Sequence, residues 1–172
     1  MDKLIIKGGK KLAGDVTVSG SKNASLPILI STILAPGAHE IRNVPFLRDI
    51  NTTIKVLESL GASIEGSGNV VRIDTTRLNS HEATYDLVKT MRASVLVLGP
   101  LLSRFGKARV SLPGGCAIGA RPINLHLKGL EALGADITLE HGYVEARARR
   151  LRGARINFDI SKIGRASCRE RV

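Results

Sequence analysis

The pattern of apolar residues in the first 80 positions predicts two helices. One helix is predicted over residues 23–34. A second is predicted further on, because Ile50, Ile54, Leu57 and Leu60 fall on one helical face. Each helix has an apolar side that needs a neighbouring element to cover it.

Strand-like runs separate and follow these helices. Strands are predicted over residues 39–43, 63–65 and 70–73, and the last two flank a Gly-Ser-Gly-Asn segment typical of a hairpin turn. Gly61 stands where the second helix must end, because glycine adopts the left-handed conformation of a helix C-terminus at little cost.

The same order of elements returns in the second half of the chain. We expect a helix over 87–102, a strand over 108–111, a helix that carries Ile123, Leu127 and Leu130, a Gly134 cap, and strands over 137–139 and 143–145. The octapeptide LESLGASI at 57–64 recurs as LEALGADI at 130–137, 73 positions later. The pattern therefore predicts two copies of one α/β unit, over about 21–80 and 86–160.

The two copies differ in length at one place. Twelve positions separate Pro45 from Leu57, whereas 17 separate Pro113 from Leu130, so the second copy carries five extra residues. They lie within Gly114–Pro122, a segment with three glycines. An insertion on a repeated scaffold is typical of a functional loop.

Cys116, inside this inserted segment, is the first candidate for chemistry. Arg121 follows five residues later, and a cation close to a thiol favours the reactive thiolate. The thiol could then act as a nucleophile, or as a proton donor once a loop closes. The alternative is a small apolar or incidental surface residue.

Several other positions could hold anionic groups. Lys22 and Asn23 stand at the start of the first helix, where anions are favoured; the alternative is a solvated lysine beside an asparagine N-cap. Arg92 lies within an apolar helix, where its guanidinium either reaches solvent or meets an anion. Arg121 and Pro122 open the helix that follows the inserted segment. His126 on that helix has the alternative of a packing histidine, and the other histidines lack metal-ligand spacing.

The charge balance raises a different hypothesis. Lys and Arg number 26 against 15 Asp and Glu, a net charge of +11, which is compatible with a basic nucleic-acid-binding module. Aromatic residues make up 3% of the chain, which argues against stacking on single-stranded bases. One basic cluster is interpreted as an exposed strand and turn, with a polyanion patch as the alternative: Arg147, Arg149, Arg150, Arg152 and Arg155.

Other classes are disfavoured by what the sequence lacks. No run is apolar enough for a membrane span, and the first 12 residues are too basic for a secretory signal, so we expect a cytoplasmic protein. Two cysteines do not suggest a disulfide framework. Neither a Walker loop, a dinucleotide fingerprint nor a nucleophile elbow is present.

Three segments resemble signatures of the UDP-N-acetylglucosamine enolpyruvyl transferases: GSKNA at 20–24, DLVKTMRAS at 86–94 and LPGGCAIGARP at 112–122. The resemblance implies an α/β (α+β) fold, the inside-out barrel of EPSP synthase, with two domains of three repeated βαβαββ units and a site between them. Residues 1–20 would be opening strands of the second domain, and residues 21–162 would supply two of three units of the other.

The resemblance also implies the reaction. Phosphoenolpyruvate would donate its enolpyruvyl group to the 3-hydroxyl of UDP-N-acetylglucosamine, the first committed step of peptidoglycan synthesis, without metal or organic cofactor. Cys116 would be the general acid, can form an adduct with phosphoenolpyruvate, and is expected to be alkylated by fosfomycin. Lys22 would bind phosphoenolpyruvate, Asn23 the sugar, and Arg92 and Arg121 anionic groups. The UDP-sugar site would be lined by Arg121, Pro122, Ile123, Asn124 and Leu125, with His126 extending it.

The chain departs from this family in two places. Many relatives carry Asp where this chain has Asn124, although an amide can still hydrogen-bond to the nucleotide sugar. Residues 163–172 match the translation of a common sequencing adapter, so we expect a non-native tail in which Cys168 has no function. Without the C-terminal half of the parent chain, the fragment is expected to be inactive.

Three alternatives remain open at this point. The sister enzyme that acts on shikimate 3-phosphate shares the fold but lacks the cysteine loop. A nucleic-acid-binding module would bind in a salt-dependent way and tolerate Cys116→Ala. A remnant that binds nucleotide sugar without turnover is the third.

Overall fold

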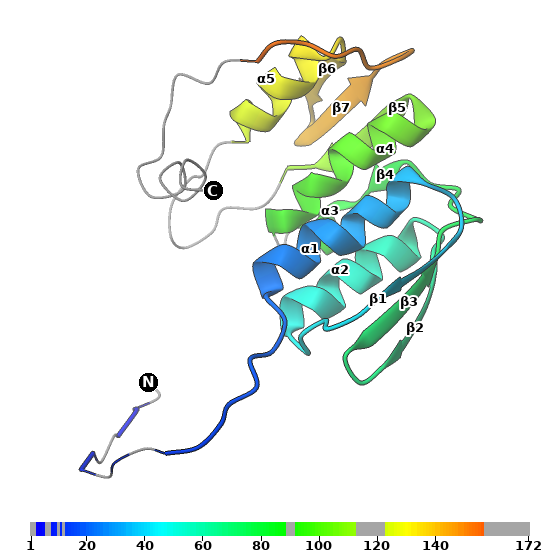
Figure 1. Ribbon diagram of the computed structural model, residues 1–172. Coiled ribbons are helices and arrows are strands. Elements are labelled where there is room, and N and C mark those ends of the chain that lie inside the picture. The colour runs from blue at the N-terminus through cyan, green and yellow to red at the C-terminus, as the bar shows by residue number, and fades with distance from the viewer. Residues whose placement is uncertain are drawn as a thin grey trace.

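The computed structural model describes residues 3–5, 8, 9, 11, 13–88, 92–112 and 123–156. Its first half contains α1 (Lys22–Ser31), the 3-10 helix η1 (Thr32–Leu34), β1 (Ala38–Ile41), α2 (Arg48–Ser59), β2 (Ser63–Ser67) and β3 (Val70–Asp74). Its second half contains β4 (Glu82–Ala83), α3 (Tyr85–Val88), the 3-10 helix η2 (Arg92–Val97), α4 (Leu98–Phe105), β5 (Lys107–Ser111), α5 (Asn124–Ala132), β6 (Asp136–Glu140) and β7 (Tyr143–Arg147). The sheets lie on the outside of a layer of helices (Figure 1).

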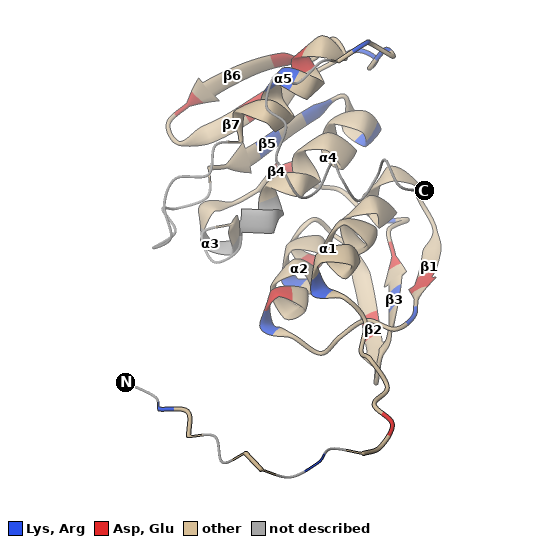
Figure 2. Ribbon diagram, turned by 60° about the vertical axis from the view of Figure 1, so that its left-hand side comes forward, with Lys and Arg blue, Asp and Glu red and all other residues tan. Residues whose placement is uncertain are grey.

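The strand pairing confirms the internal repeat. One sheet has the order β1-β3-β2 and the other β4-β5-β7-β6 (Figure 2). Ala38 of β1 and Ser63 of β2 both lie opposite Asp74, as Lys107 of β5 and Asp136 of β6 both lie opposite Arg147. The last antiparallel hairpin of each copy is therefore built in the same register.

Leucine and isoleucine side chains from both copies form one core. Leu29 of α1, Leu57 of α2 and Leu101 of α4 are fully buried, and α1 contacts α2 while α4 contacts η1. Burying such a side chain stabilises the fold by about 1.5–3 kcal/mol. The predicted stripe on α2 is confirmed, with Ile50 and Leu57 buried.

The prediction of one helix over 87–102 was wrong. The structure divides this stretch among α3, η2 and α4, whose last residue is Phe105. Pro100 explains the late start of α4: from Leu98 onward it stands in the first turn, where the missing N–H does least harm. In a helix running from residue 87, the same proline would remove an internal hydrogen bond.

Several strand ends also differ from the prediction, and one strand was missed. β1 stops at Ile41, because Asn43 takes a left-handed conformation (φ 58°) that turns the chain. β2 continues through Ser67, which leaves a turn of Gly68 and Asn69. β4, which pairs parallel to β5, is two residues long and too short to show a period of two.

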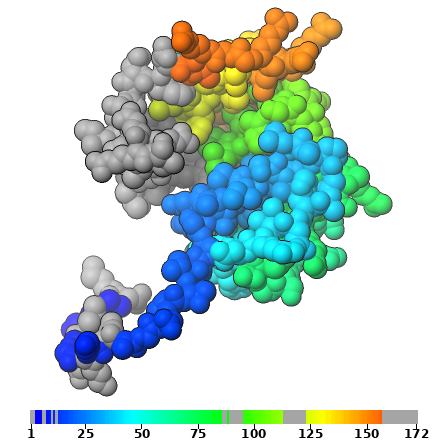
Figure 3. Space-filling view, viewed as in Figure 1, coloured from blue at the N-terminus to red at the C-terminus, as the bar shows by residue number. Residues whose placement is uncertain are grey.

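The N-terminal segment runs away from the body of the molecule (Figure 3). Val16 and Val18 are 87% and 84% exposed, and no strand forms over residues 13–20. Their predicted place in a second domain stays a prediction. Within the described part of the chain, no helix has the length and apolarity needed to cross a membrane.

Candidate active site

The N-terminal ends of four helices face the same side of the molecule. α1, α2, α4 and α5 run in roughly the same direction in Figure 1. The first N–H groups of a helix lack intrahelical partners, and the helix dipole gives that end a partial positive charge. This side of the helix layer is therefore suited to anionic ligands.

Lys22, predicted to bind phosphoenolpyruvate, is the first residue of α1 and is paired with Asp49. Its Nζ donates a hydrogen bond of 2.7 Å to Oδ2 of Asp49, in the first turn of α2. The two side chains are 45% and 35% exposed, so the pair is partly solvated and open to exchange with another anion. The sequence did not single out Asp49, because its contact with Lys22 depends on how α1 packs against α2.

Asn23 follows Lys22 on α1 and is exposed. The alternative interpretation of Asn23 as an N-cap was wrong, since Ser21 occupies the N-cap position in extended conformation. The Ser21 side chain makes no capping bond, although its carbonyl accepts hydrogen bonds from the backbone and hydroxyl of Ser25. The predicted contact between Asn23 and the sugar stays a prediction.

The 3-10 helix η2 brings the second signature beside the first. η2 begins at Arg92 and contacts α1, the helix that begins at Lys22. The Arg92 side chain is outside the description, and its role stays a prediction.

An apolar hollow of about 290 Å³ lies between η2, α4 and α5. Leu125 and His126 line it from α5, opposite Val95 and Leu96 of η2. His126 is exposed, so its alternative role as a buried packing histidine is not supported. The hollow places two predicted UDP-sugar residues next to η2.

The remaining predicted residues divide into two groups. Ile123 is the half-buried N-cap of α5, and Asn124 is the exposed first residue of that helix. Cys116, Arg121 and Pro122 lie outside the described residues, so their predicted roles are untested. Among described residues, no group of three or more His, Cys, Asp or Glu is arranged to hold a metal ion.

The perturbed carboxylates lie on the first sheet, not at the helix ends. Hydrogen bonds from Arg42 and Arg72 lower the pKa of the Glu40 carboxyl below its usual value. Hydrogen bonds from Thr76 similarly lower the pKa of Asp74. Both groups are exposed, and we assign them to the surface of the sheet and not to catalysis.

Comparison with known proteins gives consistent matches across the chain. The sequence profile of EPSP synthase (3-phosphoshikimate 1-carboxyvinyltransferase) matches residues 6–168. UDP-N-acetylglucosamine 1-carboxyvinyltransferase from Geobacter metallireducens is 83% identical over 164 residues, and the protein of that name from Myxococcus xanthus is 60% identical over 163 residues. These matches cover 95% and 93% of this chain, but the chain spans 39% of the length of each relative.

Solved structures share the fold. The enolpyruvyl transferase NikO from Streptomyces tendae matches with a TM-score of 0.71 and 26% identity, over 84% of this chain and 32% of that one. EPSP synthase from Acinetobacter baumannii matches with a TM-score of 0.65 and 22% identity, over 87% of this chain and 35% of that one. The second likeness bears on the fold alone.

Proposed function

Because the chain belongs to the EPSP synthase family of carboxyvinyltransferases, we propose that its parent protein transfers the enolpyruvyl group of phosphoenolpyruvate to the 3-hydroxyl of UDP-N-acetylglucosamine. The observation that carries this proposal is the 83% identity, over 164 residues, with a relative named for that reaction. The family name alone would equally admit shikimate 3-phosphate as acceptor.

The residues at the helix ends can support this chemistry. The acceptor hydroxyl loses its proton and adds to C2 of phosphoenolpyruvate, the carbon that carries the phosphate, while a proton is delivered to the methylene carbon. Phosphate is then eliminated, a proton is lost from the methyl group, and the enolpyruvyl group remains on the sugar as an enol ether. Lys22 beside the N-terminus of α1 would offset the charge of phosphoenolpyruvate. We assign proton delivery to Cys116, and the binding of anionic substrate groups to Arg92 and Arg121.

The acceptor would extend from the helix ends towards α5. Leu125 and His126 line a hollow against η2, and an apolar wall with few polar groups is typical of small-molecule sites. Asn124, exposed at the N-terminus of α5, could hydrogen-bond to uridine or to the sugar. In this proposal the reaction commits precursors to peptidoglycan in the cytoplasm, needs no cofactor, and is blocked when fosfomycin alkylates Cys116.

Phosphate release tests the proposal in the parent protein, extended to the length of the relatives. We expect release that depends on both phosphoenolpyruvate and UDP-N-acetylglucosamine, with a product heavier than the acceptor by one enolpyruvyl group. Lys22→Ala and Cys116→Ala should each lower turnover by roughly 100-fold or more. Lys55→Ala, which removes an exposed cation from α2, is the matched control and should retain activity. Acceptor-independent phosphate release, or full activity in both site variants, would overturn the proposal.

A further inference from the structure

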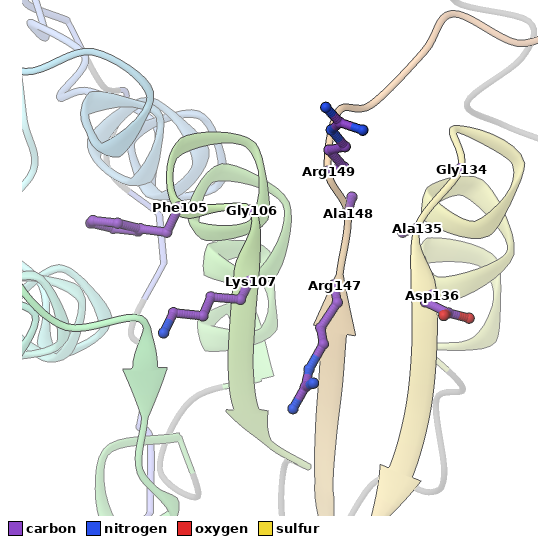
Figure 4. Close-up of a pocket in the computed structure, with 9 residues that line it drawn as sticks. All are labelled: Phe105, Gly106, Lys107, Gly134, Ala135, Asp136, Arg147, Ala148 and Arg149. Atoms are coloured by element: carbon purple, nitrogen blue, oxygen red, sulfur yellow. The ribbon is translucent and has the colours of Figure 1, made fainter.

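A second cationic surface lies at the other ends of the helices. A hollow of about 950 Å³ opens where α4 turns into β5 and where β7 ends. Figure 4 shows its lining, with Lys107 at the start of β5, Arg147 at the end of β7 and Arg149 just beyond. η2 joins the N-terminal end of α4 and Gly106 follows its C-terminal end, so the helix, about 12 Å long, separates this hollow from the candidate active site.

The three cations are poorly neutralised by the protein. All three side chains are exposed, and Asp136 is the one carboxylate that lines the hollow. Within the described part of the chain, no carboxylate lies within 4.0 Å of Lys107 or Arg149, and Arg147 has one long contact of 3.9 Å to Glu145. Glu145 itself accepts a shorter bond of 3.0 Å from Arg109.

Like charges also stand opposite one another here. Lys107 and Arg147 are direct partners across the antiparallel pair β5–β7. Such a pair is destabilising by itself, because neither strand offers the other a counter-charge. An anion bound between the two side chains would remove this repulsion.

The first repeat is an internal control for whether the fold needs these cations. The backbone bond from Ala148 N to Gly106 O has its equivalent in the bond from Thr75 N to Gly37 O, both of 2.9 Å. Ala38 lies opposite Asp74 in the first repeat, as Lys107 lies opposite Arg147 in the second. The positions equivalent to Lys107, Arg147 and Arg149 are therefore Ala38, Asp74 and Thr76. The same backbone is built without any of the three cations, so neither the helix ends nor the sheet requires them.

We propose that Lys107, Arg147 and Arg149 form a binding site for a short linear oligophosphate, separate from the candidate active site and additional to the proposed function. The three cations and Asp136 leave the lining with a net charge of +2, which calls for a ligand with several negative charges. Guanidinium groups bind phosphate oxygens in a bidentate way, and a chain of phosphate groups brings several negative charges to one ligand.

The lining favours an oligophosphate over a nucleic-acid strand. Phe105 is the one aromatic residue in it, and the Arg104 guanidinium lies 5.5 Å from its ring centroid. Bases of a single strand would therefore have one aromatic ring to stack on in this lining, and Arg104 already lies near that ring. The hollow is also of a size usual for small ligands.

Calorimetric titration with tripolyphosphate tests the site, with Lys22→Ala present in every protein to weaken anion binding at the candidate active site. We expect Lys107→Ala/Arg149→Thr, which introduces the residues found at the equivalent positions of the first repeat, to weaken binding at least 10-fold. The control Lys55→Ala/Arg77→Thr removes two exposed cations by the same substitutions and should change affinity less than 2-fold.

Each other outcome overturns the proposal. Equal losses in the two double variants would mean general attraction to a basic protein, and no measurable binding at millimolar tripolyphosphate would mean that no site exists. A duplex oligonucleotide that binds more tightly than tripolyphosphate, with the same dependence on Lys107 and Arg149, would make the ligand a nucleic-acid backbone. Transferase activity is not a readout here, so failure of the proposed function leaves this test unaffected.

Discussion

Lys22 and Asp49 join the first turns of α1 and α2 through a contact of 2.7 Å between Nζ and Oδ2. The contact ties together the N-terminal ends of these two helices. Because both side chains are more than a third exposed, the pair holds the lysine in place without binding it strongly. Another anion can therefore compete with Asp49 for the same ammonium group.

A double-mutant cycle measures the strength of this pair. With Lys22→Ala, Asp49→Ala and the double variant, we expect a coupling free energy of about 0.2–1 kcal/mol in low salt. Screening should reduce it towards zero in 1 M NaCl. Urea unfolding gives the free energies. A coupling well above this range, insensitive to salt, would show that the pair is structural and not exchangeable.

Arg104 connects the two repeats and should matter much more for stability. From α4, its Nη1 donates to Ile33 O at 3.0 Å and its Nη2 to Thr75 O at 2.8 Å, both in the first repeat. Arg104→Ala leaves two carbonyls without this donor, and we expect a loss of about 2–3 kcal/mol in the free energy of unfolding.

Two variants check that the Arg104 effect is specific. Arg104→Lys keeps the charge but lacks the planar fork, so it should recover at most half of the loss. Arg150→Ala removes an exposed arginine and should change stability by less than about 0.5 kcal/mol. Similar losses for Arg104→Ala and Arg150→Ala would contradict the inter-repeat role.

The two helix-ending glycines provide a matched steric comparison. Gly61 (φ 102°) and Gly134 (φ 92°) occupy equivalent positions in the repeats and have left-handed conformations. Alanine at either position should lower the free energy of unfolding by about 1–2 kcal/mol, because of backbone strain alone. A Cβ at Gly61 would also lie 2.8 Å from Asn79 Oδ1, whereas one at Gly134 meets nothing within 4 Å.

Thermal or urea unfolding of Gly61→Ala and Gly134→Ala should therefore give unequal losses, with Gly61→Ala the larger. Gly61→Ala combined with Asn79→Ala should remove part of the difference, because the Arg77 carbonyl oxygen, 3.1 Å from the same Cβ, remains. Equal losses for the two single variants would mean that Asn79 moves aside without cost.

The ion pairs of Glu40 predict how stability depends on pH. Because Arg42 and Arg72 lower the Glu40 pKa from 4.5, the folded state binds this proton less readily than the unfolded state. The ion pairs of Glu40 therefore stabilise the folded state above pH 4.5, and this stabilisation is lost as pH falls through the lower pKa of the folded state. Glu40→Gln should be less stable than the parent near pH 6, with the difference shrinking towards pH 3. A difference that stays constant across this range would exclude the linkage.

The sequence predicted the repeat well because its signals are local. The glycines at 61 and 134 and the stripe on α2 depend on residues within one or two turns, and each element formed close to its predicted place. β4 was missed because two residues carry no periodicity, and the helix over 87–102 failed because apolar spacing alone ignores Pro100.

The candidate site depends on contacts between residues that are far apart in sequence, which local patterns do not reveal. Lys22 could be singled out from its motif. Its contact with Asp49, 27 residues away in sequence, depends on how the two helices pack. The Lys107–Arg147 site likewise needs the β5–β7 register, which fixes two cations opposite each other across 40 residues of chain. Pairings of this kind become visible only once the elements are assembled.

Competition between acceptors tests the central claim most directly. The full-length parent would receive phosphoenolpyruvate with UDP-N-acetylglucosamine and shikimate 3-phosphate together, and the two enolpyruvyl products would be separated by mass. We expect product on the nucleotide sugar alone, with at least a roughly 1000-fold preference in kcat/KM, because a site built for one polar acceptor leaves its groups unpaired with the other. Product on shikimate 3-phosphate, or on neither acceptor, would contradict it.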